Sequence, residues 1–218
     1  MPAQAIVAAA PPGSSSARSQ PADSGRNWPL ATVLALVVLS LLVQCSPAAQ
    51  AALEFNRAAI ASGQWWRLLT GNFVHYGWLH LAANVGAFAV LGWLSVGRSS
   101  RAVWVVVLSA VAVGLGIQLW AGGTATYRGV SGVDCALLAW LLVTTAFQDG
   151  GWKAVAWLGA LLLVAAKSVY EAVTGQVLLP TSAPPGVEVV NITHVVGLGI
   201  GALAAVIAPP ARQARNGH

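Results

Sequence analysis

Charged residues are scarce in this sequence. Only 8% of its 218 residues are Asp, Glu, Lys or Arg, whereas a soluble globular domain carries about a quarter. The hydrophobic share is 57%, and the mean hydropathy is +0.71. This balance excludes a chain whose surface lies mostly in water, and it indicates a membrane protein.

Metal-ligand and disulfide patterns are also missing. The two cysteines, Cys45 and Cys135, are far apart and form no C-x-x-C spacing, which argues against a zinc site or a disulfide scaffold. A metal site of His75, His80 and His194 is disfavoured, because the first two are poorly spaced on a helix and no acidic ligand lies nearby. We expect no metal and no cofactor. The net charge of +5 comes largely from arginines near the ends of apolar segments, which sets membrane orientation and does not indicate a nucleic-acid partner.

Six apolar stretches are long enough, or nearly so, to cross a bilayer, for which about 20 residues are needed. They cover roughly residues 29–45, 78–96, 102–120, 131–147, 154–172 and 192–208. The sequence therefore predicts an all-α, polytopic membrane protein, with six transmembrane helices in a compact bundle over residues 28–208. Residues 1–27 are rich in Ala, Pro, Ser and Gly and are expected to be a disordered cytoplasmic tail. Residues 209–218 are expected to be a short basic cytoplasmic tail.

Residues 46–77 are too polar to span a membrane. They contain an alanine-rich amphipathic piece over residues 48–61, followed by "GQWWRLLT". We expect a long external loop that lies against the membrane surface.

The distribution of basic residues predicts the orientation. With six crossings and a cytoplasmic start, one side of the membrane collects seven basic residues and the other a mixed set. The basic set is Arg18, Arg26, Arg98, Arg101, Lys153, Arg212 and Arg215, and the mixed set is Glu54, Arg57, Arg67, Arg128 and Glu188. Both termini are therefore predicted to be cytoplasmic.

This orientation places the N-terminal ends of spans two, four and six in the external leaflet. Span two begins with His80 and Asn84, span four with Ser131 and span six with His194. Polar groups inside a membrane are costly and usually face a bundle interior or a water-filled cavity. We therefore expect these four side chains to converge at one depth.

A hydroxyl and an imidazole at one depth indicate nucleophilic catalysis. A serine needs a base to take its proton, and histidine is the usual base near neutral pH. Gly197 and Gly201 follow His194 on one helical face, where they allow close approach to another helix. Span four offers small partners for this approach at Gly132, Cys135 and Ala136. The sequence thus predicts a Ser131–His194 dyad.

Acyl transfer also requires donors for the developing oxyanion. His80 and Asn84, spaced i and i+4, project from one face of a helix, and with the backbone N–H of Ser131 they are expected to form an oxyanion hole. Gly129 and Gly132, beside the serine, allow close backbone approach to a substrate. Asp134 is expected to be neutral and hydrogen-bonded to its own helix, because an unpaired carboxylate at that depth is costly.

Each feature alone has a simpler interpretation. Ser131 alone is typical of helix packing, and His194 alone is typical of a structural residue or a proton path. His75 is expected in a loop or at the interface, and Lys167 with Glu171 is most simply an i,i+4 ion pair. Two other functions therefore stay open: a non-catalytic protein that binds membrane clients, and a small transporter or channel.

The ordered motifs resemble the rhomboid intramembrane serine proteases. These motifs are Trp66-Arg67, His75, His80-x-x-x-Asn84, Gly129-x-Ser131-Gly132 and His194-x-x-Gly197-x-x-x-Gly201. In detail the chain is most similar to the rhombosortase branch, through "LEFNRAAIASGQWWRLLTGNFVHYGWLHLAANV", "TYRGVSGV", "AAKSVYE" and "VVNITHVVGLGIGAL". The resemblance covers most of residues 53–206. Cys135 departs from it, since rhomboids often have Tyr there and rhombosortases His, and Asp134 is also unusual.

The resemblance implies Ser131 as nucleophile, His194 as general base, and His80 and Asn84 as oxyanion stabilisers in a six-helix fold. For rhombosortases it implies single-span membrane substrates with a C-terminal sorting tail: a Gly-Gly-type motif, a hydrophobic helix and a basic end. It places the enzyme in a bacterial inner membrane, where exported proteins are processed. A general rhomboid protease that cleaves other single-span substrates is the alternative.

Overall fold

The computed structural model describes residues 27–178, 182, 184, 187 and 189–209. The expected tails, 1–27 and 209–218, fall outside this part except for one residue each, Asn27 and Pro209. Several residues used to predict orientation also lie outside the described part, namely Arg18, Arg26, Glu188, Arg212 and Arg215. The division into tails and a membrane domain therefore stays a prediction.

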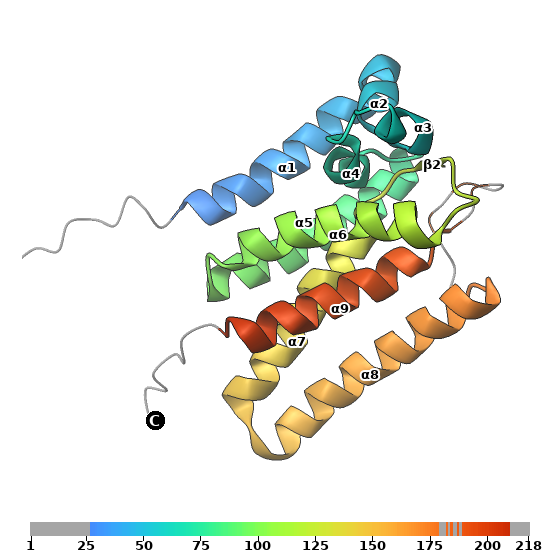
Figure 1. The fold of residues 1–218 in the computed structure, drawn as a ribbon. Helices are drawn as coiled ribbons and strands as arrows, with labels where there is room; N and C mark the ends of the chain where they lie inside the picture. The colour runs from blue at the N-terminus through green and yellow to red at the C-terminus, as the bar shows by residue number, and fades with distance from the viewer. Residues whose placement is uncertain (1–26, 179–181, 183, 185–186, 188, 210–218) are drawn as a thin grey trace, which may run out of the picture.

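Six helices of at least 16 residues occupy nearly the same residues as the six predicted apolar stretches (Figure 1). They are α1 (Trp28–Gln44), α5 (Trp78–Arg98), α6 (Ala102–Trp120), α7 (Ser131–Asp149), α8 (Gly151–Thr174) and α9 (Ile192–Ile207). Gly150, with φ +66°, links α7 directly to α8. These helices end where their apolar runs end, because a run of non-polar side chains must pair its backbone internally in lipid.

Four of these helices, α5 to α8, are long and apolar enough to cross a membrane. Helix α1 passes the same test only together with α2 (Pro47–Leu53), from which it is bent by 119°. Helix α9 has 16 residues, short of a typical span. The chain is therefore an integral, multi-pass helical membrane protein with four or five candidate spans, and the six crossings stay a prediction.

The segment between α1 and α5 is folded. It contains α2, β1 (Phe55–Asn56), α3 (Arg57–Ala61), α4 (Arg67–Thr70) and the 3-10 helix η1 (Gly71–Phe73). The expected amphipathic piece over 48–61 is interrupted, because β1 pairs antiparallel with β2 (Thr126–Tyr127), with Phe55 opposite Tyr127. The side chain of Asn56 then accepts a hydrogen bond from the Ala59 N–H and starts α3. Sequence patterns do not reveal a two-residue strand whose partner is 70 positions away.

Two arginines hold this segment in place. Arg57 donates hydrogen bonds to the carbonyls of Ile117, Gln118 and Ala121 at the end of α6, each at 2.7 Å. These carbonyls lie at the C-terminal end of α6, where helix acceptors lack their full set of backbone partners, although the Ile117 carbonyl also accepts the Ala121 N–H. Arg67 donates to the carbonyls of two residues of the α2 region, Ala51 at 2.8 Å and Glu54 at 2.9 Å.

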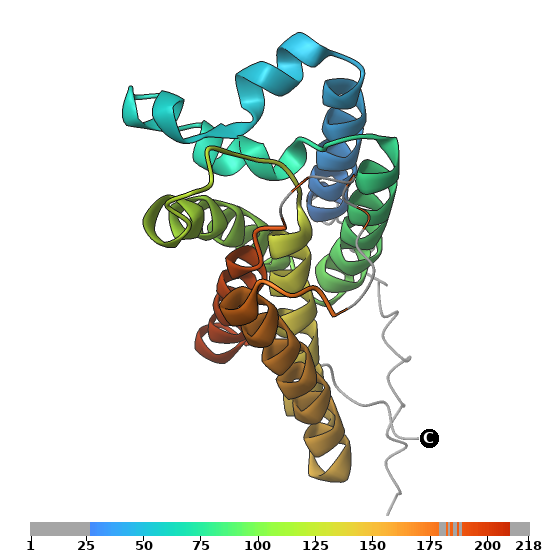
Figure 2. The same ribbon diagram turned by 90° about the vertical axis from the view of Figure 1, so that its right-hand side faces the viewer.

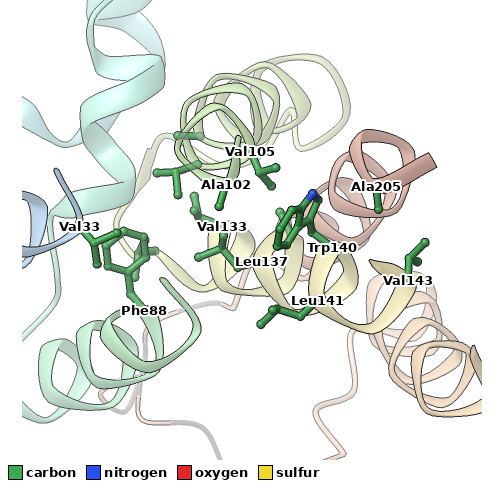
Figure 3. Close-up of a cluster of buried hydrophobic side chains, with 14 of the residues drawn as sticks. Val33, Phe88, Ala102, Val105, Val133, Leu137, Trp140, Leu141, Val143 and Ala205 are labelled. Atoms are coloured by element: carbon green, nitrogen blue, oxygen red, sulfur yellow. The ribbon is translucent and has the colours of Figure 1, made fainter. Parts of the chain in front are cut away.

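Helix α7 lies in the middle of the bundle and contacts α5, α6, α8 and α9. Its side chains Val133, Leu137 and Trp140 are at most 1% exposed, and Figure 3 shows them between side chains from α6 and α9. Helix α1 packs against α5, where Val33 lies beside Phe88 (Figure 3). Helix α8 lies at the edge of the bundle in both views (Figures 1 and 2). Helix α7 is therefore the centre of the core, and the neighbouring helices pack against it.

Helices α7 and α9 touch through their backbones. A Cβ atom on Gly197 would collide with the Gly132 carbonyl, and one on Gly201 would collide with the Ala136 carbonyl. These are the small residues that the sequence suggested for a close contact. Any larger side chain at Gly197 or Gly201 must push the two helices apart.

We predict that Gly197→Ala destabilises the protein by about 1–3 kcal/mol, the usual cost of overpacking. Gly199→Ala is the matched control on the same helix, because its Cβ would meet no atom within 4 Å. That change should be neutral or stabilise by up to about 1 kcal/mol through helix propensity. Thermal unfolding of the purified protein in detergent measures both. Equal midpoints for the two variants would contradict the close contact.

Candidate active site

The first turns of α7 and α9 bring Ser131 and His194 together. The His194 Nε2 atom lies 3.1 Å from the Ser131 Oγ atom, and both residues are half-buried. Ser131 is the first residue of α7, and His194 lies in the first turn of α9. At this distance the hydroxyl and the imidazole share one hydrogen bond, the arrangement in which a base can take the proton of a nucleophile.

The turn before Ser131 is held in an unusual conformation. Gly129 has φ +135°, which favours glycine because other residues rarely adopt it. The Tyr127 hydroxyl donates a 2.7 Å hydrogen bond to the Gly129 carbonyl. Because Ser131 opens α7, its backbone N–H has no partner within the helix and is available to an anionic group.

His80 lies on the other side of this turn. The Tyr76 backbone N–H is directed at the His80 Nδ1 atom, 3.3 Å away, so Nδ1 is the acceptor and Nε2 carries the hydrogen in the neutral ring. A Cβ on Gly129 would lie 3.4 Å from the His80 Nε2 atom, which places the ring edge against the turn. One amide hydrogen of Asn84 is used at 2.9 Å on the His80 carbonyl, and the second remains available as a donor.

Tyr127 was not among the predicted site residues. It is buried, and burial raises the pKa of its phenol, while the neighbouring hydroxyls of Thr193 and Ser131 act in the opposite direction. Its neutral hydroxyl therefore lies among the groups at the start of α7 and α9. The only sequence signal was its position four residues before Ser131, and this spacing by itself does not indicate a functional role.

A cluster of side chains around Tyr76 and Arg128 connects the segment between α1 and α5 to His80. The Tyr76 ring stacks on His80 with centroids 5.7 Å apart, and the Arg128 guanidinium lies 5.4 Å from the Tyr76 centroid. Arg128 also donates to Glu54 at 2.8 Å and to Gln50 at 3.0 Å. Sequence analysis had assigned Glu54 and Arg128 only to the mixed-charge side of the membrane. Their contact depends on the fold of the loop and has no local sequence signature.

His75 is in a loop, one of its two expected positions, where it is 1% exposed and packs edge-on against His80, 5.4 Å between centroids. The expectation for Asp134 was wrong. Asp134 has no hydrogen bond to its own helix among the described residues, and its Oδ1 atom is buried without a partner. The i−4 carbonyl, that of Val130, already accepts the backbone N–H groups of Val133 and Asp134. The Lys167–Glu171 ion pair is present, with 2.7 Å between Nζ and Oε2.

Within the described residues, no group of three or more His, Cys, Asp or Glu side chains is arranged to hold a metal ion. Comparison with protein-family models identifies a rhomboid domain over residues 62–210. The chain belongs to the rhomboid family. Comparison with individual curated proteins found no match.

Rhomboid-family membership makes this an integral membrane protein of a family of intramembrane serine proteases that act on membrane-protein substrates within the bilayer. The matched region contains all four polar residues that the sequence placed at one depth. It also contains both glycines at which α9 approaches α7. Helices α1, α2 and α3 and strand β1 precede the matched region. They contact it through the packing of α1 on α5, the arginine contacts and the pairing of Phe55 with Tyr127.

Burial lowers the pKa of His75 to about 3, and the nearby His80 acts in the same direction. Folded His75 therefore stays neutral where an unfolded chain, with a pKa near 6.5, takes up a proton. We predict that stability is fully present above about pH 6.5 and falls as the pH decreases towards 3, by up to about 1.4 kcal/mol per pH unit. Chemical denaturation at several pH values measures this slope. The His75→Gln variant should show a flatter profile between pH 6 and 4, and an unchanged slope would refute the assignment to His75.

Proposed function

We propose that this rhomboid protein is a serine endopeptidase with a Ser131–His194 dyad. The observation that carries the proposal is the 3.1 Å contact between Nε2 and Oγ. In the proposed reaction, Nε2 takes the Oγ proton as Oγ attacks a peptide carbonyl. The imidazolium then gives this proton to the leaving amine, and a water molecule, activated by the same imidazole, hydrolyses the acyl-enzyme.

The oxyanion of the tetrahedral intermediate is proposed to be stabilised by three donors: the Ser131 backbone N–H, the His80 Nε2–H and the Asn84 amide. Two features support this role. The Tyr76 N–H selects the His80 tautomer that carries hydrogen on Nε2, and the Gly129 turn, against which His80 lies, has no side chain to obstruct a substrate. Preformed donors of this kind need no rearrangement during the reaction.

The proposed substrates are exported proteins with a C-terminal sorting tail of the Gly-Gly type. The rhombosortase-like segments of the sequence support this assignment. A peptide bond in a membrane helix is protected because its backbone groups are already paired. Two glycines lower the cost of unwinding, since each is about 1 kcal/mol less favourable in a helix than alanine. A general rhomboid protease with other single-span substrates is the second candidate.

The proposed location is a bacterial inner membrane, with both termini in the cytoplasm and the dyad near the outer leaflet. The basic residues on one side of the predicted spans support this orientation. Three tryptophan side chains are more than half exposed: Trp65, Trp66 and Trp78. They lie at the opposite end of the helices from Arg98 and Arg101. Exposed tryptophans are typical of a membrane–water interface.

We predict that co-expression with a reporter ending in a Gly-Gly motif, a hydrophobic helix and a basic end yields a cleaved reporter. Ser131→Ala should abolish cleavage without lowering the amount of folded protein, because it removes only the nucleophile. Immunoblotting of the reporter measures the product. A second reporter with an N-terminal anchor separates the two candidate substrate classes, since a rhombosortase should leave it intact.

Reaction with a fluorophosphonate probe is the control that does not depend on the substrate. The parent protein should label, and both Ser131→Ala and His194→Ala should not. A transporter or channel would show no Ser131-dependent labelling, and a client-binding protein would retain its partners equally in the parent and in Ser131→Ala. Either result would overturn the protease assignment.

We predict that Asn84→Ala lowers kcat on a cleaved reporter by about a hundred- to a thousandfold, the usual effect of losing one oxyanion donor. KM should change little, because the interaction exists mainly in the transition state. Leu79→Ala is the control on the same helix, since Leu79 is 75% exposed. Equal kcat values for the two variants would exclude Asn84 from the oxyanion hole.

A further inference from the structure

Helix α8 contains a buried carboxylate that the proposed mechanism does not use. Most of α8 is exposed: only 6% of its apolar stretch is buried, against 61% of the apolar stretch of α7. Ser168 and Glu171 are its only buried residues. Glu171 is 1% exposed, and a charge at that position in a membrane protein is costly unless it is paired. The partners of the carboxylate therefore show which parts of the chain it holds together.

Both carboxylate oxygens of Glu171 have a partner. Oε2 lies 2.7 Å from the Lys167 Nζ atom, and Oε1 accepts a 2.9 Å hydrogen bond from the Leu178 backbone N–H. Leu178 follows the end of α8, where Gly175 adopts φ +69° and its N–H caps the Glu171 carbonyl at 2.9 Å. The carboxylate thus folds the chain back onto α8 directly after the helix ends.

The backbone carbonyl of Glu171 continues this connection to α9. It accepts a 3.3 Å hydrogen bond from the Asn191 side chain. The Asn191 carbonyl in turn accepts the backbone N–H of His194 at 3.1 Å. A short chain of contacts therefore leads from Glu171 to the residue whose imidazole faces Ser131.

We propose that Glu171 is a positioning residue for His194, a role that rests on the proposed dyad. Its carboxylate holds the end of α8 to the chain that follows, at Leu178, and its backbone carbonyl, which lies at that end, accepts the Asn191 side chain. Glycine packing against α7 sets how near α9 lies to Ser131, and Val196 of α9 also packs against Gly116 of α6. Apolar packing of this kind depends less on direction than a hydrogen bond does. The polar contacts at Glu171 and Asn191 therefore resist sliding and rotation of α9. Without them the imidazole is held at the correct distance from Ser131 less of the time.

The test uses the full-length protein, the fluorophosphonate probe and the sorting-tail reporter. Glu171→Ala removes the partner of the Leu178 N–H and of Lys167 but leaves the backbone carbonyl that accepts from Asn191. By loosening the end of α8 it is expected to lower both the probe-labelling rate and kcat by about tenfold or more, with KM little changed. Glu171→Gln retains an oxygen for the Leu178 N–H and should recover part of the loss. Val173→Ala, on the same helix and 80% exposed, is the matched control and should behave like the parent.

Asn191→Ala removes the bridge and leaves the carboxylate untouched, so it decides the question if Glu171→Ala does not fold. It should also lower labelling, and the double variant should be no worse than the more severe single one, because both act on one chain of contacts. Labelling that is unchanged in folded Glu171→Ala or in Asn191→Ala, with the parent labelled, overturns this inference alone. Cleavage that falls while labelling stays constant also overturns it, since α8 would then act on substrate entry. If the parent protein neither reacts with the probe nor cleaves the reporter, the proposed dyad and this inference are both refuted.

Discussion

Backbone contact between α7 and α9 is the constraint on which the site depends. Lipid chains are as apolar as leucine, so helices in a membrane associate through close packing and polar contacts rather than through the hydrophobic effect. Gly197 and Gly201 remove the side chains that would separate the two backbones. With α7 fixed by its buried core, this contact carries the first turn of α9 to the first turn of α7, where the imidazole and the hydroxyl meet.

The position of Ser131 at a helix start has chemical consequences. A serine in the middle of a membrane helix would have a backbone N–H already bonded within the helix, and its hydroxyl would face packed side chains. At the start of α7 the N–H has no partner within the helix, and the preceding Gly129 has no side chain between this turn and His80. The folded segment between α1 and α5 lies next to this region and contacts it through the β1–β2 pair and the Arg128 side chain. The same segment selects the tautomer of His80 through Tyr76, so it takes part in preparing the site.

Sequence reasoning located the long helices because hydropathy and length are properties of a continuous stretch. It located Ser131, His80, Asn84 and His194 because polar residues at the N-terminal ends of alternate spans must lie at one end of a bundle. Contacts that form only in three dimensions were missed. The strand pair of Phe55 with Tyr127 has two residues on each side and no periodicity, and the Asn191 contact uses a backbone carbonyl. The Asp134 expectation was wrong because it assumed that a buried acid near a helix start bonds to that helix.

Helices α7 and α8 constrain α9 in different ways. This difference gives a reason for the Lys167–Glu171 ion pair in the otherwise apolar and exposed helix α8. On the α7 side, close packing fixes the separation of the helix axes, since any closer approach meets a carbonyl oxygen. Packing of a flat glycine strip changes little when α9 shifts along its axis by a fraction of an ångström, yet such a shift is enough to misalign a proton transfer. On the α8 side, the contacts of Glu171 and Asn191 are directional and weaken with the same small shift. A helix that bears the proposed base is held most exactly when it has both kinds of contact, and a purely apolar α8 would supply no directional one.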